Sequence, residues 1–151
     1  MVTVNAKAKI RSAWMNLMEM NISGAPVVDD EGVLVGIISI KDIYHSIIER
    51  FKRAKALRET MTPQIMDDVE IEKEETRELT IAMRAVMDST VSSLLPMNQA
   101  VMHLGPLDSL DRAIKLMAEH SINRLPIVKE GKIVGIVTRQ DVIMVLSGRS
   151  R

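Results

Sequence analysis

The chain has 151 residues, 46% of them hydrophobic, so it can bury a core typical of one domain or of two small halves that share one. Because 20 basic residues balance 20 acidic ones, no overall field favours nucleic acid or an anionic membrane, and the absence of cysteine excludes disulfides and cysteine-rich metal sites. No stretch approaches the roughly 18 apolar residues of a membrane span, and the N-terminus lacks a secretory signal pattern, so we expect a cytoplasmic protein.

The chain opens with a predicted strand followed by an amphipathic helix. Residues 2–4 have the β-branched character of a short strand. Apolar residues then recur at helical spacing from Ile10 to Met18. This helix should end before Gly24 and Pro26, because both residues interrupt the helical pattern.

A predicted hairpin and a second helix follow. Two short β-branched strands, 27–28 and 33–39, flank a polar turn. From Ile40 the helical spacing returns and runs into the basic stretch 50–58, and Pro63 ends that helix. We interpret the basic stretch as a solvated helix face rather than as a nucleic-acid site.

The middle of the chain, residues 57–99, is a connecting segment with structure of its own. It predicts a strand near residues 69–71 and a helix over residues 75–87. Its apolar residues match those of residues 110–125 at an offset of 31, which resembles half of a third copy of the unit. The alternative is an ordinary inserted amphipathic helix with chance similarity.

The last part of the chain repeats the order of the first. The chain therefore divides into a first unit (1–56), the connecting segment (57–99) and a second unit (100–151). We expect Asp108 to cap the first helix of the second unit, because its carboxylate can accept bonds from the unpaired backbone N–H groups there. The predicted elements are a strand at 101–104, a helix over 108–120, a hairpin centred on Glu130 and Gly131, and a helix over 140–146.

The two units share a sequence pattern in register. The segment Pro26-Val27-Val28 corresponds to Pro126-Ile127-Val128, and the turn that runs from Gly36 to Asp42 corresponds to the turn from Gly135 to Asp141. The offset is 100 residues before the hairpin and 99 after it, because the second hairpin turn is one residue shorter. Such a duplication predicts that the two units pack as paired halves.

Each repeated turn places a glycine, a hydroxyl three residues later and an aspartate three beyond it, where a strand leads into a helix. Glycine lets a ligand or a neighbouring backbone approach closely. The hydroxyl can donate to a phosphate oxygen, the N–H groups of the helix start favour an anion, and the aspartate can accept from both hydroxyls of a ribose. The structural alternative is a routine helix cap beside a glycine packing contact. Two copies of the pattern favour the nucleotide interpretation.

These patterns resemble the cystathionine-beta-synthase (CBS) domain family, whose members usually occur as tandem pairs called Bateman modules. The resemblance covers about residues 2–49 and 101–146. It implies an α+β fold of two βαββα repeats related by a pseudo-two-fold axis, with an inserted strand and helix segment between them. It also implies two clefts for adenosine-containing ligands such as AMP, ADP, ATP or S-adenosylmethionine, which act as regulatory ligands rather than as required cofactors.

Carried over residue by residue, the resemblance implies that Asp42 and Asp141 hold the ribose and that Ser39 and Thr138 hold the phosphate. The second site is the stronger candidate, because the chain begins almost at its first strand and the first site lacks part of its wall. The resemblance also implies that the ligand approaches closely at Gly36 and Gly135 and that the backbone at Ala25 and Leu125 contacts the edge of the adenine. Lys41, Arg124 and Arg139 are implied phosphate partners, and His103 is an implied ligand contact on the opening strand of the second unit.

Two functional interpretations remain open. In the first, the chain is a regulatory module that senses nucleotides and passes a conformational shift to another domain, or to a regulated enzyme or transporter. In the second, it is a ligand-free scaffold or dimerisation module. An enzyme is not expected, because no pairing of nucleophile and base recurs and no metal cluster is evident. We expect a homodimer formed through paired sheets.

Overall fold

The computed structural model describes residues 1–61 and 66–149. Pro63, which was predicted to end the second helix, lies outside the described residues. The first unit has the predicted order of strand, helix, strand, strand and helix. Its elements are β1 (Val4–Asn5), α1 (Ile10–Glu19), β2 (Gly24–Val28), β3 (Leu34–Ser39) and α2 (Ile40–Met61).

The second unit repeats this order except for its opening strand. Residues 101–104 were predicted to form a strand, but only Leu104 pairs, as an isolated parallel bridge to Ile127. The predicted cap at Asp108 is also wrong, because Ser109 accepts the bond from the Arg112 N–H at the start of the helix while Asp108 accepts from the Gly105 N–H. The elements of the second unit are α4 (Leu110–His120), β4 (Arg124–Lys129), β5 (Lys132–Thr138) and α5 (Arg139–Leu146), and a short helix, η1 (Val91–Leu94), precedes them in the connecting segment.

The connecting segment contains a long helix, α3 (Asp68–Met87). The strand predicted near residues 69–71 is therefore wrong, since these residues form the first turn of α3. The cause is a capping box that the hydrophobic pattern did not reveal: Asp67 accepts from the Glu70 N–H at 2.8 Å, and the Glu70 carboxylate accepts from the Asp67 N–H at 3.3 Å. The insertion is thus helical at its start, as an ordinary amphipathic helix would be.

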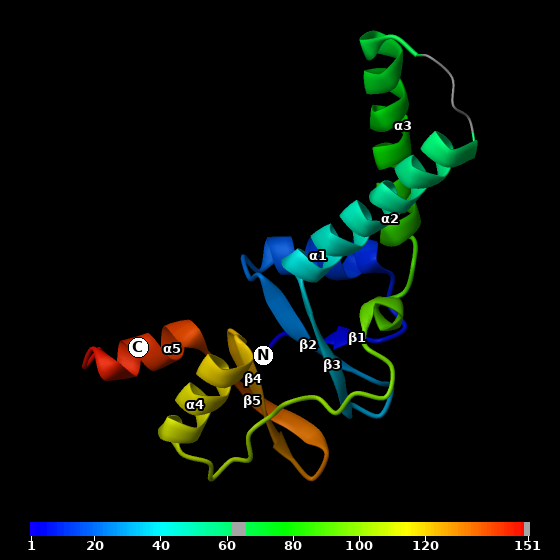
Figure 1. Ribbon diagram of the computed structural model, residues 1–151. Coiled ribbons are helices and arrows are strands. Elements are labelled where there is room, and N and C mark those ends of the chain that lie inside the picture. The colour runs from blue at the N-terminus through cyan, green and yellow to red at the C-terminus, as the bar shows by residue number, and fades with distance from the viewer. Residues whose placement is uncertain (62–65, 150–151) are drawn as a thin grey trace.

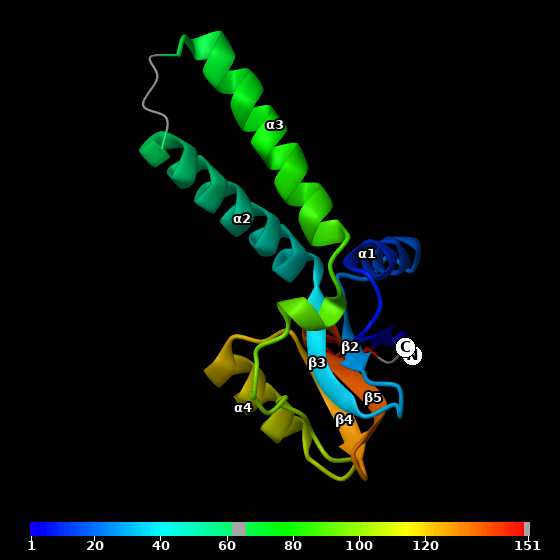
Figure 2. The same cartoon turned by 90° about the vertical axis from the view of Figure 1, so that its right-hand side faces the viewer.

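Helices α2 and α3 form an antiparallel hairpin that projects from the strands (Figure 1, Figure 2). Two ion pairs join the helices. Lys55 Nζ lies 2.5 Å from Glu75 Oε1, and Arg58 Nε lies 2.7 Å from Glu78 Oε1. The side chains of Arg58 and Glu78 are only 19% and 10% exposed, so this second pair is largely removed from water.

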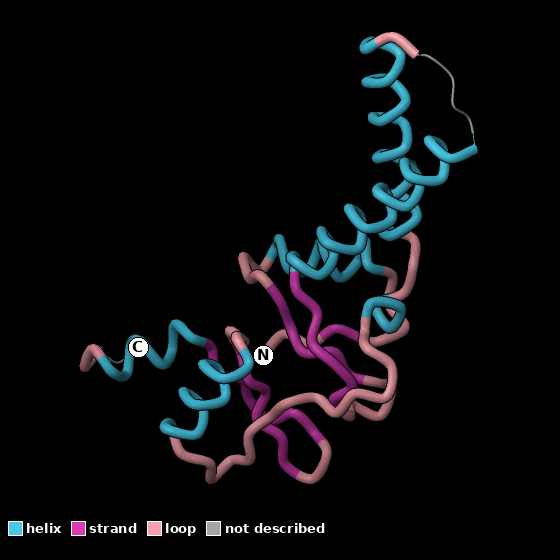
Figure 3. Tube along the Cα trace, in the orientation of Figure 1, coloured by secondary structure: helices cyan, strands magenta, loops and turns pink. Residues whose placement is uncertain are grey.

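The strands lie in the centre, with α1 and the helical hairpin on one side and α4 and α5 on the other (Figure 3). The sheet of the first unit has the order β1-β2-β3, and β4 pairs with β5 in the second unit. Both hairpins have a register shift at the same place, after Val27 and after Ile127. The internal repeat of the sequence is therefore a repeat of backbone geometry.

Each unit has its own hydrophobic core. In the first unit Ile10, Leu17 and Val27 are fully buried, and in the second Leu125 is fully buried. The turns of the two hairpins meet through an antiparallel bridge between Val33 and Lys132. None of the helices in the described ranges combines the length and hydropathy that a membrane span requires.

Candidate functional site

The repeated turns have nearly identical geometry where each strand passes into its helix. In the second unit the Thr138 N–H and hydroxyl both donate to Asp141 Oδ2, at 2.9 and 2.7 Å, and the Asp141 N–H donates to Thr138 Oγ1 at 3.2 Å. In the first unit Ser39 and Asp42 make the same three bonds at 2.8, 2.7 and 3.2 Å. Each hydroxyl therefore caps its helix, and each aspartate completes a capping box by accepting from the backbone N–H of the cap residue, as the structural alternative requires.

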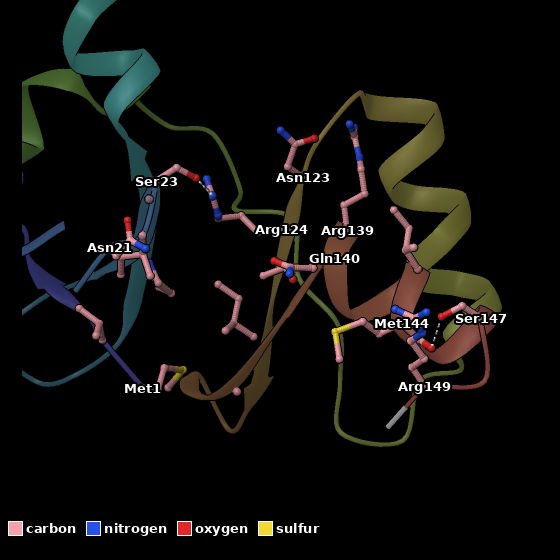
Figure 4. A pocket seen from close by; sticks show the side chains of 18 residues that line it. Met1, Asn21, Ser23, Asn123, Arg124, Arg139, Gln140, Met144, Ser147 and Arg149 are labelled. Atoms are coloured by element: carbon pink, nitrogen blue, oxygen red, sulfur yellow. Dashed lines mark hydrogen bonds between the residues drawn. The ribbon is translucent and has the colours of Figure 1, made fainter. Parts of the chain in front are cut away.

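A cleft of about 890 Å³ lies between the two units, beside the turn of the second unit (Figure 4). From the second unit it is lined by Gly135 and Thr138 and by the first turns of α5. From the first unit it is lined by Asn21 and Ser23 in the loop before β2, by Gly24 and Pro26 in β2, and by Met1 and Val2 at the start of the chain. The cleft is thus built from both units, although only one repeated turn opens into it.

The electrostatic character of the cleft is positive. Arg124, Arg139 and Arg149 line it, and no aspartate or glutamate is among the described residues that do so. Apolar side chains, including Ile22, Ile136 and Met144, supply the rest of the surface. An arginine-rich wall next to an apolar wall suits a ligand that has both an anionic group and a flat apolar part.

Arg124 links the two units across the cleft. Its Nη2 atom donates to Ser23 Oγ at 2.6 Å, and Figure 4 shows its side chain directed toward Ser23. Burial lowers the pKa of the Arg124 guanidinium, and the negative charge of Asp42 opposes that shift. Arg124 was predicted only as a phosphate partner, and it is also the side chain that joins the second unit to the first.

The structure brings together only some of the predicted site residues. Gly135, Thr138, Arg124 and Arg139 line the cleft, whereas Asp141 does not. The other predicted residues lie outside it: Ala25 and Leu125 are buried in the two cores, Gly36 lies beneath Leu95, Ser39 and Asp42 cap α2, Lys41 is exposed, and His103 is exposed with Nδ1 2.8 Å from the Val101 carbonyl oxygen.

The wall supplied by the first unit was missed by sequence reasoning. Asn21 and Ser23 precede β2, and Arg149 follows α5, so none of them belongs to the repeated turn. A usable signal was available for Asn21 and Ser23. A pseudo-two-fold axis places the loop before the second strand of one unit next to the turn of the other, and that loop is adjacent to the duplicated Gly24-Ala25-Pro26 segment.

The chain matches the CBS domain family over residues 1–49 and 91–148, and it belongs to this family. Among curated proteins it is 33% identical over 127 residues to the uncharacterized protein MJ1426 of Methanocaldococcus jannaschii, covering 83% of this chain and 73% of that protein. Two further relatives from that organism, 24% and 29% identical, are longer proteins, and the chain spans 39% and 36% of their lengths.

Solved structures of CBS-domain proteins share the fold. CBSX2 in complex with AMP is 22% identical with a TM-score of 0.67, covering 98% of this chain and 88% of that one. The CBS domain pair of protein MJ0100, in complex with 5′-methylthioadenosine and S-adenosylmethionine, is 24% identical with a TM-score of 0.62, covering 97% and 88%. The predicted pairing of two CBS repeats is confirmed.

Proposed function

We propose that the chain is a regulatory module that binds an adenosine-containing nucleotide in the cleft between its repeats. The observation that carries this proposal is the arginine-lined cleft at the start of α5, where Thr138 and Arg139 face the loop that contains Ser23. Three guanidinium groups favour phosphate, because a planar guanidinium can donate two bonds to one anion. The volume of the cleft, about 890 Å³, lies in the range of small-molecule sites.

The two kinds of wall assign the parts of the ligand. The phosphate lies against Arg139 and the Thr138 hydroxyl at the N-terminus of α5, where the helix dipole also favours negative charge. The adenine lies against apolar side chains such as Ile22 and Ile136. Asp141 lies behind Thr138 and does not line the cleft, so its carboxylate holds the Thr138 side chain in position beside the ligand.

The structural relatives support this choice of ligand class. One was solved with AMP and another with 5′-methylthioadenosine and S-adenosylmethionine, and adenosine is the part that these ligands share. S-Adenosylmethionine carries no phosphate, so it would not use the arginine wall in the way that AMP or ATP does. The charge of the cleft therefore favours AMP, ADP or ATP, which suits a sensor of cellular energy.

Thermal unfolding with and without millimolar nucleotide tests the proposal. AMP, ADP or ATP should raise the unfolding temperature by mass action, since a ligand that binds only the folded state stabilises it. Arg139→Gln should reduce this rise without changing the unfolding temperature of the free protein by much. Arg77→Gln is the matched control, because Arg77 lies on α3 with its side chain exposed and does not line the cleft.

Absence of any shift with these three nucleotides and S-adenosylmethionine would instead favour the scaffold interpretation. One observation supports that alternative: both repeated turns form complete helix caps, which gives the serine, threonine and aspartate a structural role without a ligand. Retention of the full shift by Arg139→Gln would move the binding site away from this cleft.

In this proposal the chain does not catalyse a reaction. Nucleotide occupancy changes the relative positions of the two repeats, and the effect reaches a regulated enzyme or transporter only to the extent that the ligand prefers one arrangement. We propose a cytoplasmic homodimer. Sedimentation at tens of micromolar should give twice the chain mass, and a monomer at that concentration contradicts the dimer.

A further inference from the structure

Arg124 lies at the boundary between the cleft and the first unit. Its side chain lines the cleft, and its Nη2 atom donates to Ser23 Oγ at 2.6 Å. The guanidinium also packs against Gly24, since a Cβ atom built there would lie 2.5 Å from Nη1 and 3.0 Å from Cζ. Among the described residues, no carboxylate forms an ion pair with Arg124. A guanidinium has five N–H donors, so most of its hydrogen-bonding capacity is open to an anion in the cleft.

Ser23 joins this contact to the start of helix α2. Its backbone carbonyl accepts from the N–H of Ile40, the first residue of α2, at 2.9 Å. The negative charge of Asp42, in the first turn of α2, also favours the charged form of Arg124. The residue that accepts from Arg124 is therefore the residue that anchors the helix start, and a movement of the loop at Ser23 displaces α2.

The second unit has the same kind of anchor at the start of α5. The Asn123 carbonyl accepts from the N–H of Arg139, the first residue of α5, at 2.8 Å. By the sequence offset of 100, Asn123 corresponds to Ser23. By the offset of 99, Arg139 corresponds to Ile40. Because Arg124 follows Asn123 in the chain and bonds to Ser23, it connects the two loops that anchor α5 and α2.

An anion in the cleft competes with Ser23 for Arg124. A hydrogen bond between a guanidinium and a neutral hydroxyl contributes less than one between a guanidinium and a phosphate, in which both partners are charged. The exchange leaves both hydrophobic cores intact, since neither side chain belongs to them. A bound phosphate is therefore able to release the loop of the first unit from the second unit without unfolding either one.

Helix α2 carries a displacement of this loop into the helical hairpin. The helix runs unbroken from Ile40 to Met61, and the ion pair between Arg58 and Glu78 joins it to α3 in a largely buried position. Figure 2 shows that the hairpin begins beside the strands and projects away from them. A change in direction at the first turn of α2 should therefore move both helices together.

Resting on the proposed function, we propose that the contact between Arg124 and Ser23 is the switch that converts nucleotide occupancy into movement of the helical hairpin. In the free chain Arg124 holds the loop before β2, and with it the start of α2, against the second unit. A bound phosphate draws the guanidinium away from Ser23, the loop is released, and the hairpin changes its angle to the second unit. The hairpin is the output element of the module.

Fluorescence energy transfer between the hairpin and the second unit tests this switch. The sequence has no cysteine, so Glu59→Cys and Asp111→Cys place one label near the end of α2 and one on α4. Both side chains are exposed, and neither lines the cleft. A trace of labelled chain in an excess of unlabelled chain keeps the transfer within one molecule. The tightest-binding of AMP, ADP and ATP, chosen by calorimetry, should change the transfer efficiency of the otherwise wild-type chain.

Ser23→Ala removes the acceptor of Arg124 but keeps the backbone carbonyl that anchors Ile40. Without nucleotide, its transfer efficiency should equal that of the nucleotide-bound wild-type chain, and nucleotide should change it no further. The nucleotide should bind about threefold to tenfold more tightly, because it no longer has to break a hydrogen bond. Ser12→Ala is the matched control, since Ser12 is exposed on α1 and does not line the cleft, and it should behave like the wild-type chain.

Two results would overturn the inference and leave the proposed function intact. The first is nucleotide binding to the wild-type chain without a change in transfer efficiency, and the second is a change of the same size in Ser23→Ala. Weaker nucleotide binding by folded Ser23→Ala would also overturn it, because Ser23 would then position Arg124 for the ligand instead of competing with the ligand. No binding of AMP, ADP or ATP to the wild-type chain removes the proposed function itself and the inference with it.

Discussion

Thr138 and Asp141 are held together by three hydrogen bonds at the start of α5, all of them within 3.2 Å. These bonds fix both Thr138, which lines the cleft, and the Asp141 carboxylate, which lies behind it. Ser39 and Asp42 repeat this arrangement at the start of α2, away from the cleft. The chain thus contains its own matched control for separating the stability role of the cap from a binding role.

We expect the variants Thr138→Val and Ser39→Ala to lower the free energy of unfolding by similar amounts, about 1 kcal/mol each, because each removes one N-cap acceptor. Only Thr138→Val should also weaken AMP binding, since Thr138 alone of the two lines the cleft. Chemical denaturation and calorimetry measure the two effects. Equal loss of AMP affinity in both variants would contradict the assignment of the cleft.

The arginines that line the cleft predict that ligand affinity depends on the phosphate group of the ligand and on the salt concentration. AMP should bind more tightly than adenosine, and raising the ionic strength should weaken AMP binding while leaving adenosine binding nearly unchanged. The reason is that Arg139 and Arg149 are exposed, so their attraction for an anion is screened. Competition titrations at low and high salt measure both ligands. Equal affinity for AMP and adenosine at low salt would contradict the assignment of the arginines as phosphate ligands.

Gly24 should not tolerate a side chain. A Cβ atom there would lie 2.7 Å from the Ile38 carbonyl oxygen and 2.5 Å from Arg124 Nη1, so both backbone and guanidinium must shift. Gly24→Ala should lower the free energy of unfolding by about 1–3 kcal/mol. Gly105→Ala is the control, because a Cβ atom there would meet the Asp108 carboxyl group at ordinary contact distances, 3.6 Å from Oδ2 and 4.0 Å from Cγ. Thermal unfolding should therefore separate the two alanine variants clearly.

The ion pair within the helical hairpin should be costly to break from one side. In the part of the chain that the structure describes, Glu78 Oε2 is buried without a hydrogen-bond partner, and Oε1 depends on Arg58. Arg58→Met should destabilise the hairpin by up to about 3 kcal/mol, because it leaves a buried carboxylate unpaired. Adding Glu78→Met should restore most of the loss. Hydrogen exchange of the backbone amides in α2 and α3 measures the stability of the hairpin in each variant. The double variant should be more stable than the sum of the two single changes would give.

Sequence reasoning predicted the fold where the pattern was duplicated. The hairpin around Gly131 and the helix after Thr138 lie where the alternation and the caps indicated, because both signals are local. It failed where local signals conflicted. Val69 and Ile71 are β-branched and alternate with a polar residue as in a strand, but the Asp67–Glu70 capping box starts a helix there instead. At Leu104 the backbone pairs for a single residue, too short for the strand that was expected.

The cleft could be predicted only in part. Thr138, Arg139 and Gly135 belong to the repeated turn and were found from it. Asn21 and Ser23 come from the other unit, and their position depends on how the two halves pack. The contact between Arg124 and Ser23 spans 101 residues of sequence, so no local pattern encodes it. Long-range packing therefore decides which of two similar turns opens to solvent.

Helix α2 begins at the residue after Ser39, includes Asp42 in its first turn, and continues for 22 residues to the far end of the hairpin. At about 1.5 Å per residue its axis is about 33 Å long. A tilt of about 10° at the first turn would therefore carry the tip through about 6 Å, by the rise per residue alone. The helical hairpin therefore amplifies small angular changes near the junction of the repeats. The resulting displacements of its tip are large enough for paired fluorescent probes to follow.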